Sequence, residues 1–230
     1  MYPRIGPRRF ARRVQDADSL PVADDSVSYP AWYARSWHYL PDGYLSRGSV
    51  RLYESLIARL YNGALEGRVL RHVAARVRAL GAGSATDLGC GPGHLLSVLG
   101  DELPGVEVTG FDLSPFMVER AHAVVGLASE RATAVHADAR SLPLPDESSP
   151  VLVATHLLGH LPNSVATEVL GEAARVLAPG GRFLVLDHSW HRLPEPGLLA
   201  VRARERLLGG ILTLTTYAHP EPVAAVPVPA

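Results

Sequence analysis

Ser84-Ala-Thr-Asp-Leu-Gly-Cys-Gly-Pro-Gly93 is the stretch that decides the fold of this chain. A short run ending at Leu88 is followed by glycines at positions 89, 91 and 93, and then by a largely apolar run over residues 95–99. This order is typical of a strand, a tight turn and a helix, because glycine permits φ > 0 and a close backbone approach. The first amides of such a helix are unpaired and lie at the positive end of its dipole. We therefore expect the turn to hold a small ligand.

Two more predicted strands follow the glycine turn. Residues 107–112 predict a second strand that ends in a carboxylate about 20 residues after the turn, where doubly wound folds place the acid that accepts ribose hydroxyls. Asp112 is therefore a candidate for sugar binding. Residues 132–136 predict a third strand, and the acidic turn around Asp138 that follows could receive an adenine amino group.

Histidines follow the fourth and fifth expected strands. The fourth covers residues 150–155, and the fifth follows a Pro-Gly-Gly break and ends at Asp187. Ligands of a doubly wound sheet bind outside the carboxyl ends of the strands. We therefore expect four imidazoles near the ligand: His156, His160, His188 and His191.

The ordered motifs together resemble the class I S-adenosylmethionine (SAM) dependent methyltransferases, in the group that includes the ubiquinone and menaquinone C-methyltransferases. The resemblance covers residues 50–187. Its Asp-x-Gly-x-Gly-x-Gly spacing differs from the Gly-x-Gly-x-x-Gly of dinucleotide folds, so dinucleotide binding is the weaker hypothesis. The resemblance implies an α/β, doubly wound, Rossmann-like sheet with helices on both faces, SAM as cofactor and S-adenosylhomocysteine as product. The cofactor site that it implies consists of Asp87, Gly89, Cys90, Gly91, Gly93, Asp112, Leu113, Met117, Asp138, Ala139 and His156.

The length and composition of the 230-residue sequence fit one α/β domain. A chain of this size buries about 70% or more of its unfolded surface without a disulfide framework or metal clip. The single cysteine fits a reducing compartment, and no apolar run is long enough to span a bilayer, so we expect a cytoplasmic protein. The net charge of −1 gives no general attraction to nucleic acid. The expected partner is a small-molecule substrate, and the oligomeric state stays open, with a homodimer among the options.

The N-terminal part is expected to divide in two. Residues 1–28, rich in arginine and then acidic, predict a flexible tail and linker rather than a nucleic-acid arm or transit peptide. Residues 29–82 predict an aromatic cap followed by helices over residues 50–62 and 64–80, because six aromatic side chains fall within residues 29–44. The cap can provide an apolar wall for the substrate through Trp32, Tyr33 and Trp37, or it can only anchor the segment. Tyr53 and Tyr61 resemble a pair of tyrosines in the quinone enzymes. This resemblance implies a contact between Tyr61 and the cofactor.

The C-terminal part is shorter than the fold usually requires. The stretch between Asp187 and Ile211 is too short for the helix plus strand that normally precede the final hairpin. Residues 200–206 and 211–218 predict a closing β-hairpin, although the first segment also consists of good helix formers. The cofactor-binding domain is therefore expected over residues 83–218, and residues 219–230 form a tail without regular structure.

The histidines are the candidates for chemistry. His156 and His160 could accept a proton from a phenol, enol or amine, although the family resemblance favours a structural role for His160. His188 and His191 suit substrate contacts. A metal ion held by these histidines and Asp187 is not favoured, because Gly159 and Pro162 disfavour the helical turn that an i, i+4 pair would need.

The leading hypothesis is a SAM-dependent methyltransferase that acts on a small, largely apolar molecule at oxygen, nitrogen or carbon. An enzyme that uses the same site for a cyclisation or rearrangement, or a non-catalytic SAM-binding partner protein, are the alternatives. The Asn/Asp-Pro-Pro-Tyr/Phe signature of enzymes that methylate nitrogen in nucleic acids and proteins is absent after the fourth expected strand. Macromolecular substrates are therefore disfavoured.

Overall fold

The computed structural model describes residues 3–37, 40–57, 65–126 and 130–220, and gives no side-chain description for residues 56 and 57. Its centre is one seven-stranded sheet with the order β3-β2-β1-β4-β5-β7-β6. The strands are β1 (Ser84–Leu88), β2 (Glu107–Asp112), β3 (Ala132–His136), β4 (Ser149–Thr155), β5 (Leu177–His188), β6 (Ala200–Leu207) and β7 (Leu212–Ala218).

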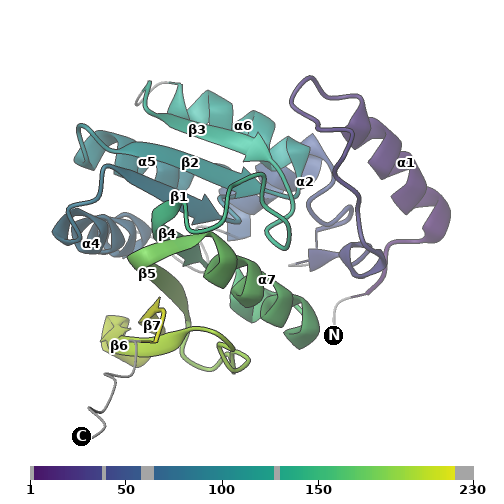
Figure 1. The fold of residues 1–230 in the computed structure, drawn as a ribbon. Helices are drawn as coiled ribbons and strands as arrows, with labels where there is room; N and C mark the ends of the chain where they lie inside the picture. Colours follow the sequence, from purple (N-terminus) through teal and green to yellow (C-terminus); the bar gives the residue numbers. More distant parts are fainter. Residues whose placement is uncertain (1–2, 38–39, 58–64, 127–129, 221–230) are drawn as a thin grey trace, which may run out of the picture.

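The first five strands are parallel, and the last two form an antiparallel hairpin at one edge (Figure 1). The strand order reverses beside β1, which pairs with β2 on one side and β4 on the other. The carboxyl ends of β1 and β4 therefore border the crevice where doubly wound sheets bind ligands. β7 pairs antiparallel with β5 and places Leu184 opposite Thr216.

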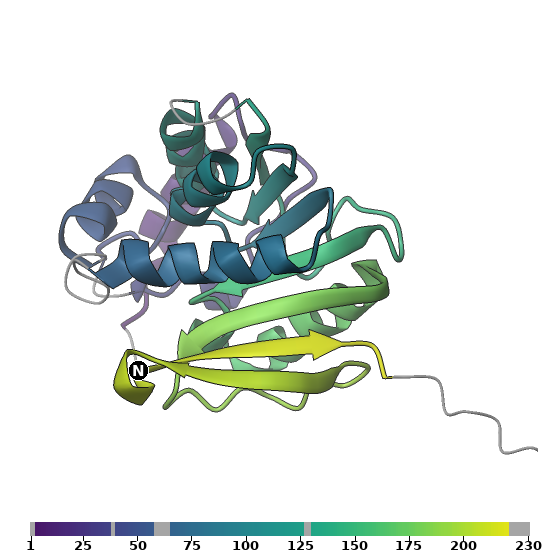
Figure 2. The ribbon, with the colours of Figure 1, turned by 90° about the vertical axis from the view of Figure 1, so that its left-hand side faces the viewer.

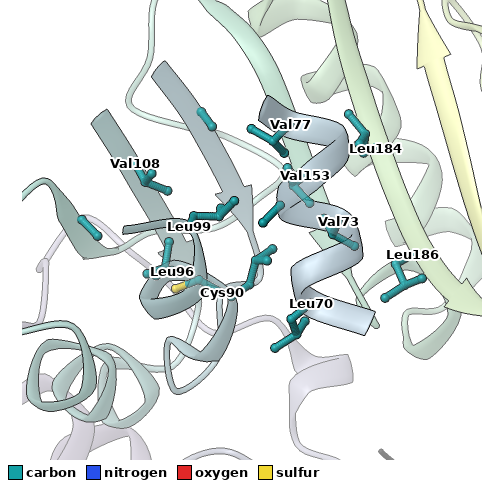
Figure 3. Packing of buried hydrophobic residues seen from close by; sticks show 14 of the residues in the cluster. Leu70, Val73, Val77, Cys90, Leu96, Leu99, Val108, Val153, Leu184 and Leu186 are labelled. Carbon is teal, nitrogen blue, oxygen red and sulfur yellow. The ribbon is translucent and has the colours of Figure 1, made fainter. Parts of the chain in front are cut away.

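Helices cover both faces of the sheet (Figure 2). The helices α4 (Glu66–Ala79), α5 (His94–Glu102) and α6 (Pro115–Val125) pack on one face, and α7 (Asn163–Val176) packs on the other. Figure 3 shows how α4 directs Val73 and Val77 toward strand residues such as Val153. These side chains recur at helical spacing, so one stripe of α4 is apolar and buried.

The N-terminal segment is folded, which corrects the expectation of a flexible tail and linker over residues 1–28. Pro7–Asp18 is the helix α1. It places Phe10, Val14 and Ala17 in the hydrophobic cluster that contains Tyr33 and Met117. The following residues are also fixed, because the amide of Asp24 donates to Nδ1 of buried His136 at 2.9 Å. Four arginines in α1 suggested a solvated terminus, but Arg9 and Arg13 pair with the carboxylate of buried Asp42. Arg8 and Arg12 are exposed.

The expected helix over residues 64–80 is confirmed as α4, whereas the segment between α1 and α4 differs from the expected helix over residues 50–62, whose last part lies outside the described residues. The segment contains the short turn η1 (Ala31–Tyr33), the helix α2 (Arg47–Leu52) and the π-helical turn η3 (Tyr53–Ile57). The cap of α2 is Ser46, whose side chain accepts from the Ser49 amide. The predicted cofactor contact of Tyr61 lies outside the described residues, as does most of the predicted C-terminal tail.

The closing hairpin is confirmed, and residues 198–208 contain a strand rather than a helix. The described chain has no helix between β5 and β6, so the hairpin follows a non-helical connection. Leu212 and Leu214 of β7 join the core beneath α4. The segment with local helix propensity is β6, and its antiparallel pairing with this anchored strand β7 explains why the tertiary fold selects a strand there. None of the described helices has the length and apolar character needed to cross a membrane.

Candidate functional site

The glycine turn after β1 adopts the expected left-handed conformations. Gly91 has φ +54°, and a Cβ built there would meet no atom within 4 Å, so the space in front of this residue is open. Gly93 has φ +86° and begins α5 so close to α6 that a Cβ would lie 3.0 Å from the Ala121 backbone. Glycine at the first position leaves room for a ligand, and glycine at the second lets two helices approach each other.

Asp112 fixes the geometry of the turn. One carboxylate oxygen accepts from the Gly91 amide at 2.9 Å, and the other accepts from the Ser114 amide at 2.8 Å. Burial raises the pKa of Asp112 to about 6, whereas these two backbone hydrogen bonds lower it. A carboxylate oxygen has more than one lone pair, so each oxygen can still accept a hydroxyl from a ligand.

A cavity of ≈ 130 Å³ opens at the carboxyl edge of the sheet, in front of the turn. Most of the predicted cofactor residues border it, from the turn, the end of β2, α6 and the loop after β3. They are Gly89, Gly91, Asp112, Leu113, Met117, Asp138, Ala139 and His156. The predicted substrate residues Trp32, Tyr33 and Trp37 line the same cavity, together with Tyr44. The aromatic segment therefore faces the predicted cofactor site and is also anchored to α6 through Met117.

A second, smaller cavity adjoins the first along the turn. Cys90, Gly91 and His156 border it, and Cys90 is the one predicted cofactor residue that borders this cavity alone. Its polar lining includes Glu66 at the start of α4 and His94 at the start of α5, with Nδ1 of His94 3.1 Å from Glu66. The hydrogen bond to Glu66 raises the pKa of His94. No local pattern in the sequence predicts this pair, because the two residues meet only when α4 packs beside α5.

Asp87 and Gly93 border neither cavity. Asp87 is fully buried at the end of β1, and neither carboxylate oxygen has a hydrogen-bond partner among the described residues. Burial, with a smaller effect from the charge of Asp112, raises the pKa of Asp87 well above its ordinary value. A buried carboxyl group without a partner is costly to the fold, which makes a structural role an insufficient reason for it.

Asp138 has a strong partner within the chain. Its carboxylate accepts from the Arg140 side chain, with the shortest distance 2.7 Å, and also from the Arg140 amide at 2.9 Å. The sequence prediction of an adenine contact did not include Arg140, which borders the cavity as well. The paired carboxylate retains lone pairs for one further donor.

The four histidines gather at the ends of β4 and β5, as expected from the sheet order. His156 and His160 border the larger cavity, whereas His188 and His191 border neither. The ring centroids of His156 and His188 are 5.0 Å apart, and those of His160 and His191 are 5.2 Å apart. Burial lowers the pKa of His156 to about 4. A neutral imidazole at this position can accept a proton or bind a cation.

Comparisons with known proteins agree with this architecture. The family described as "Methyltransferase domain" matches residues 85–181. The demethylmenaquinone methyltransferase of Thermus thermophilus is 34% identical over 153 residues, which are 62% of this chain and 67% of that protein. The trans-aconitate 2-methyltransferase of Streptomyces coelicolor is 39% identical, but the match covers 54% of this chain and only 42% of that protein. The solved PH0226 protein from Pyrococcus horikoshii OT3 shares the fold, with a TM-score of 0.60 at 20% identity over 74% of this chain and 99% of that one.

The parallel sheet with one reversed strand and the glycine turn define a Rossmann-like methyltransferase fold. The chain belongs to the class I SAM-dependent methyltransferases. SAM is the cofactor of this family, and the residues present fit it. The open space in front of Gly91 admits a ligand against the turn, and Asp112 borders that space with lone pairs available to ribose hydroxyls.

Proposed function

We propose that this protein transfers a methyl group from SAM to a small, largely apolar acceptor at oxygen, nitrogen or carbon. The observation that carries the proposal is the cavity that joins the glycine turn and Asp112 on one side to Trp32 and Trp37 on the other. Bound SAM supplies a methyl group on a positively charged sulfur, which leaves as a neutral thioether.

The residues divide into three groups along the cavity. Asp112 accepts from the ribose, and Leu113 and Met117 pack against the adenine. Glu66 and His94 in the smaller cavity face the methionine half, where a carboxylate and a histidine suit its ammonium and carboxylate groups. Under this assignment the charged methionine end of SAM occupies the smaller, polar cavity. The larger cavity is left for the less polar parts of the cofactor and the acceptor.

The acceptor lies between the aromatic cap and α7. Leu161, Val165 and Val169 provide apolar wall on the α7 side, and the indoles of the cap face them. Holding the acceptor atom close to the methyl group can supply about 7 to 11 kcal/mol of the barrier reduction. A general base contributes only about 10² to 10⁴-fold, so the proposal does not depend on whether His156 or His160 takes a proton.

The experiment has two stages. Calorimetric titration with SAM and S-adenosylhomocysteine is expected to show one site per chain, which Asp112→Ala weakens strongly. Radiolabelled SAM is then incubated with a panel of phenols, quinones and amines, and labelled product is expected from at least one of them. Binding without transfer, while an acceptor is consumed and no S-adenosylhomocysteine forms, would instead indicate a cyclisation or rearrangement. The absence of any binding would contradict the proposal.

A further inference from the structure

Three side chains at the ends of two neighbouring strands form a set of metal-ligand type. His156 follows β4, and Asp187 and His188 end β5. One ligand atom from each lies within 4.8 Å of the other two. Asp187 and His188 are only 3% and 6% exposed, so these two members are screened from solvent, whereas His156 is partly exposed at the cavity.

The carboxylate of Asp187 is held in place from several directions. One oxygen accepts from the Gly159 amide at 2.6 Å, and the other accepts from the His188 amide at 2.9 Å and from Nδ1 of His191 at 2.7 Å. A Cβ at Gly159 would collide with the His191 ring and the Asp187 carboxylate, so glycine is needed for this approach. Outer hydrogen bonds of this kind orient the ligands of protein metal sites.

His156 contributes an independent observation. Its φ of +53° is unusual for a residue other than glycine, and its Nδ1 is buried without a hydrogen-bond partner among the described residues. Backbone strain of this kind is unfavourable and is concentrated at functional sites. A buried nitrogen without a partner adds a further cost, which binding of a cation would offset.

We propose that His156, Asp187 and His188 bind one divalent transition-metal ion such as Zn²⁺. Two imidazoles and one carboxylate form a set that suits Zn²⁺ and its neighbours in the series, and three protein ligands leave at least one coordination position open. The sequence argument against a metal concerned His156 and His160, four residues apart on one segment. The structure replaces His160 by two ligands from the adjacent strand, so the objection from Gly159 and Pro162 no longer applies.

The open position defines the class of acceptor, a step that rests on the proposed function. His156 also borders the larger cavity, so a metal on its imidazole lies at the cavity wall and can bind an acceptor oxygen. A hydroxyl on a metal ion loses its proton to solvent more readily. Its oxygen then forms the bond to the SAM methyl carbon while the carbon–sulfur bond breaks, and the bonding pair stays on sulfur. The acceptor would therefore carry a phenol or hydroxy-acid oxygen.

The test uses the full-length protein after removal of metals with a chelator. Titration with Co²⁺, followed by visible absorption, is expected to show one equivalent bound, and Zn²⁺ is expected to displace it. His188→Ala and Asp187→Asn should each weaken binding more than about 100-fold, and His191→Ala about 10- to 100-fold, because His191 acts only through Asp187. His72→Ala is the matched control. This histidine lies on α4 and pairs with Glu205 of β6, so its loss should leave metal binding unchanged.

Circular dichroism and thermal unfolding check that each variant is folded, and His156→Asn replaces His188→Ala if the latter is not. Acetohydroxamate, a bidentate oxygen ligand, should shift the Co²⁺ spectrum if a coordination position is open. Less than one equivalent of bound metal, or unchanged binding by folded His188→Ala, would overturn the proposal. Calorimetry with SAM on the same samples keeps the two proposals apart. Metal binding without SAM binding supports the metal site and counts against the proposed function alone.

Discussion

In our proposal, Asp112 serves the fold and the cofactor with the same two oxygens. Its hydrogen bonds to the amides of Gly91 and Ser114 hold the turn and the start of α6 together. The remaining lone pairs are the ones that we assign to the ribose. Because burial raises its pKa to about 6, this dual role should depend on pH in a measurable range.

The first prediction concerns cofactor affinity. We expect S-adenosylhomocysteine to bind with constant affinity well above pH 6 and then to lose up to about tenfold in affinity per pH unit below it, because protonation turns one acceptor oxygen of Asp112 into a donor. The charge of Asp112 also acts on Asp87, whose pKa burial raises well above its ordinary value. Calorimetry between pH 8 and pH 5 measures the effect. Asp112→Asn should bind weakly throughout and lose the pH dependence, and a wild-type affinity that stays level to pH 5 would contradict the assignment.

At the scale of elements, local patterns predicted what local interactions decide. The turn at residues 89–93 and the five parallel strands follow from glycine spacing and from short apolar runs, so the sequence was sufficient for them. α1 was missed because its apolar stripe of Phe10, Val14 and Ala17 lies among four arginines, and only contact with the aromatic segment makes it a stable helix. Glu66 and His94 were missed for the same physical reason, since tertiary packing alone brings them together.

The contact of α1 with the aromatic segment yields the second prediction. Ala17 is fully buried against the cluster that contains Tyr33 and Met117. Ala17→Asp should bury a charge without a partner and detach α1, which lowers the unfolding temperature and exposes Arg12 and Arg13 to trypsin. Ala11→Asp, at an exposed position of the same helix, is the matched control and should behave like the wild type. Equal proteolysis rates for the two variants would show that α1 is not held by this contact.

At the scale of the whole molecule, two buried carboxyl groups that we predict at the cofactor site lower the free energy of unfolding as pH rises. In the unfolded chain an aspartate ionises near pH 4, whereas burial raises the folded-state pKa of Asp112 to about 6 and that of Asp87 well above its ordinary value. The folded protein therefore retains protons that the unfolded chain has already lost. By linkage, Asp112 makes the free energy of unfolding fall as pH rises from about 4 to about 6. The raised pKa of Asp87 has an effect of the same sign.

The third prediction follows from this sign. Asp87→Asn removes a carboxyl group that has no hydrogen-bond partner in the described part of the chain, and it should raise the free energy of unfolding at pH 7.5 by more than about 1 kcal/mol, the scale of one pKa unit. At pH 4 the two proteins should be equally stable, because Asp87 is protonated in the folded state and half-protonated or more in the unfolded chain. Urea denaturation at pH 4, 6 and 7.5 measures the difference, with exposed Asp101→Asn as the control. If Asp87→Asn is less stable than wild type at pH 7.5, the buried carboxyl group stabilises the fold after all. If it is more stable but binds SAM more weakly, Asp87 is retained for the cofactor at a cost to stability, as expected of a residue with no partner within the fold.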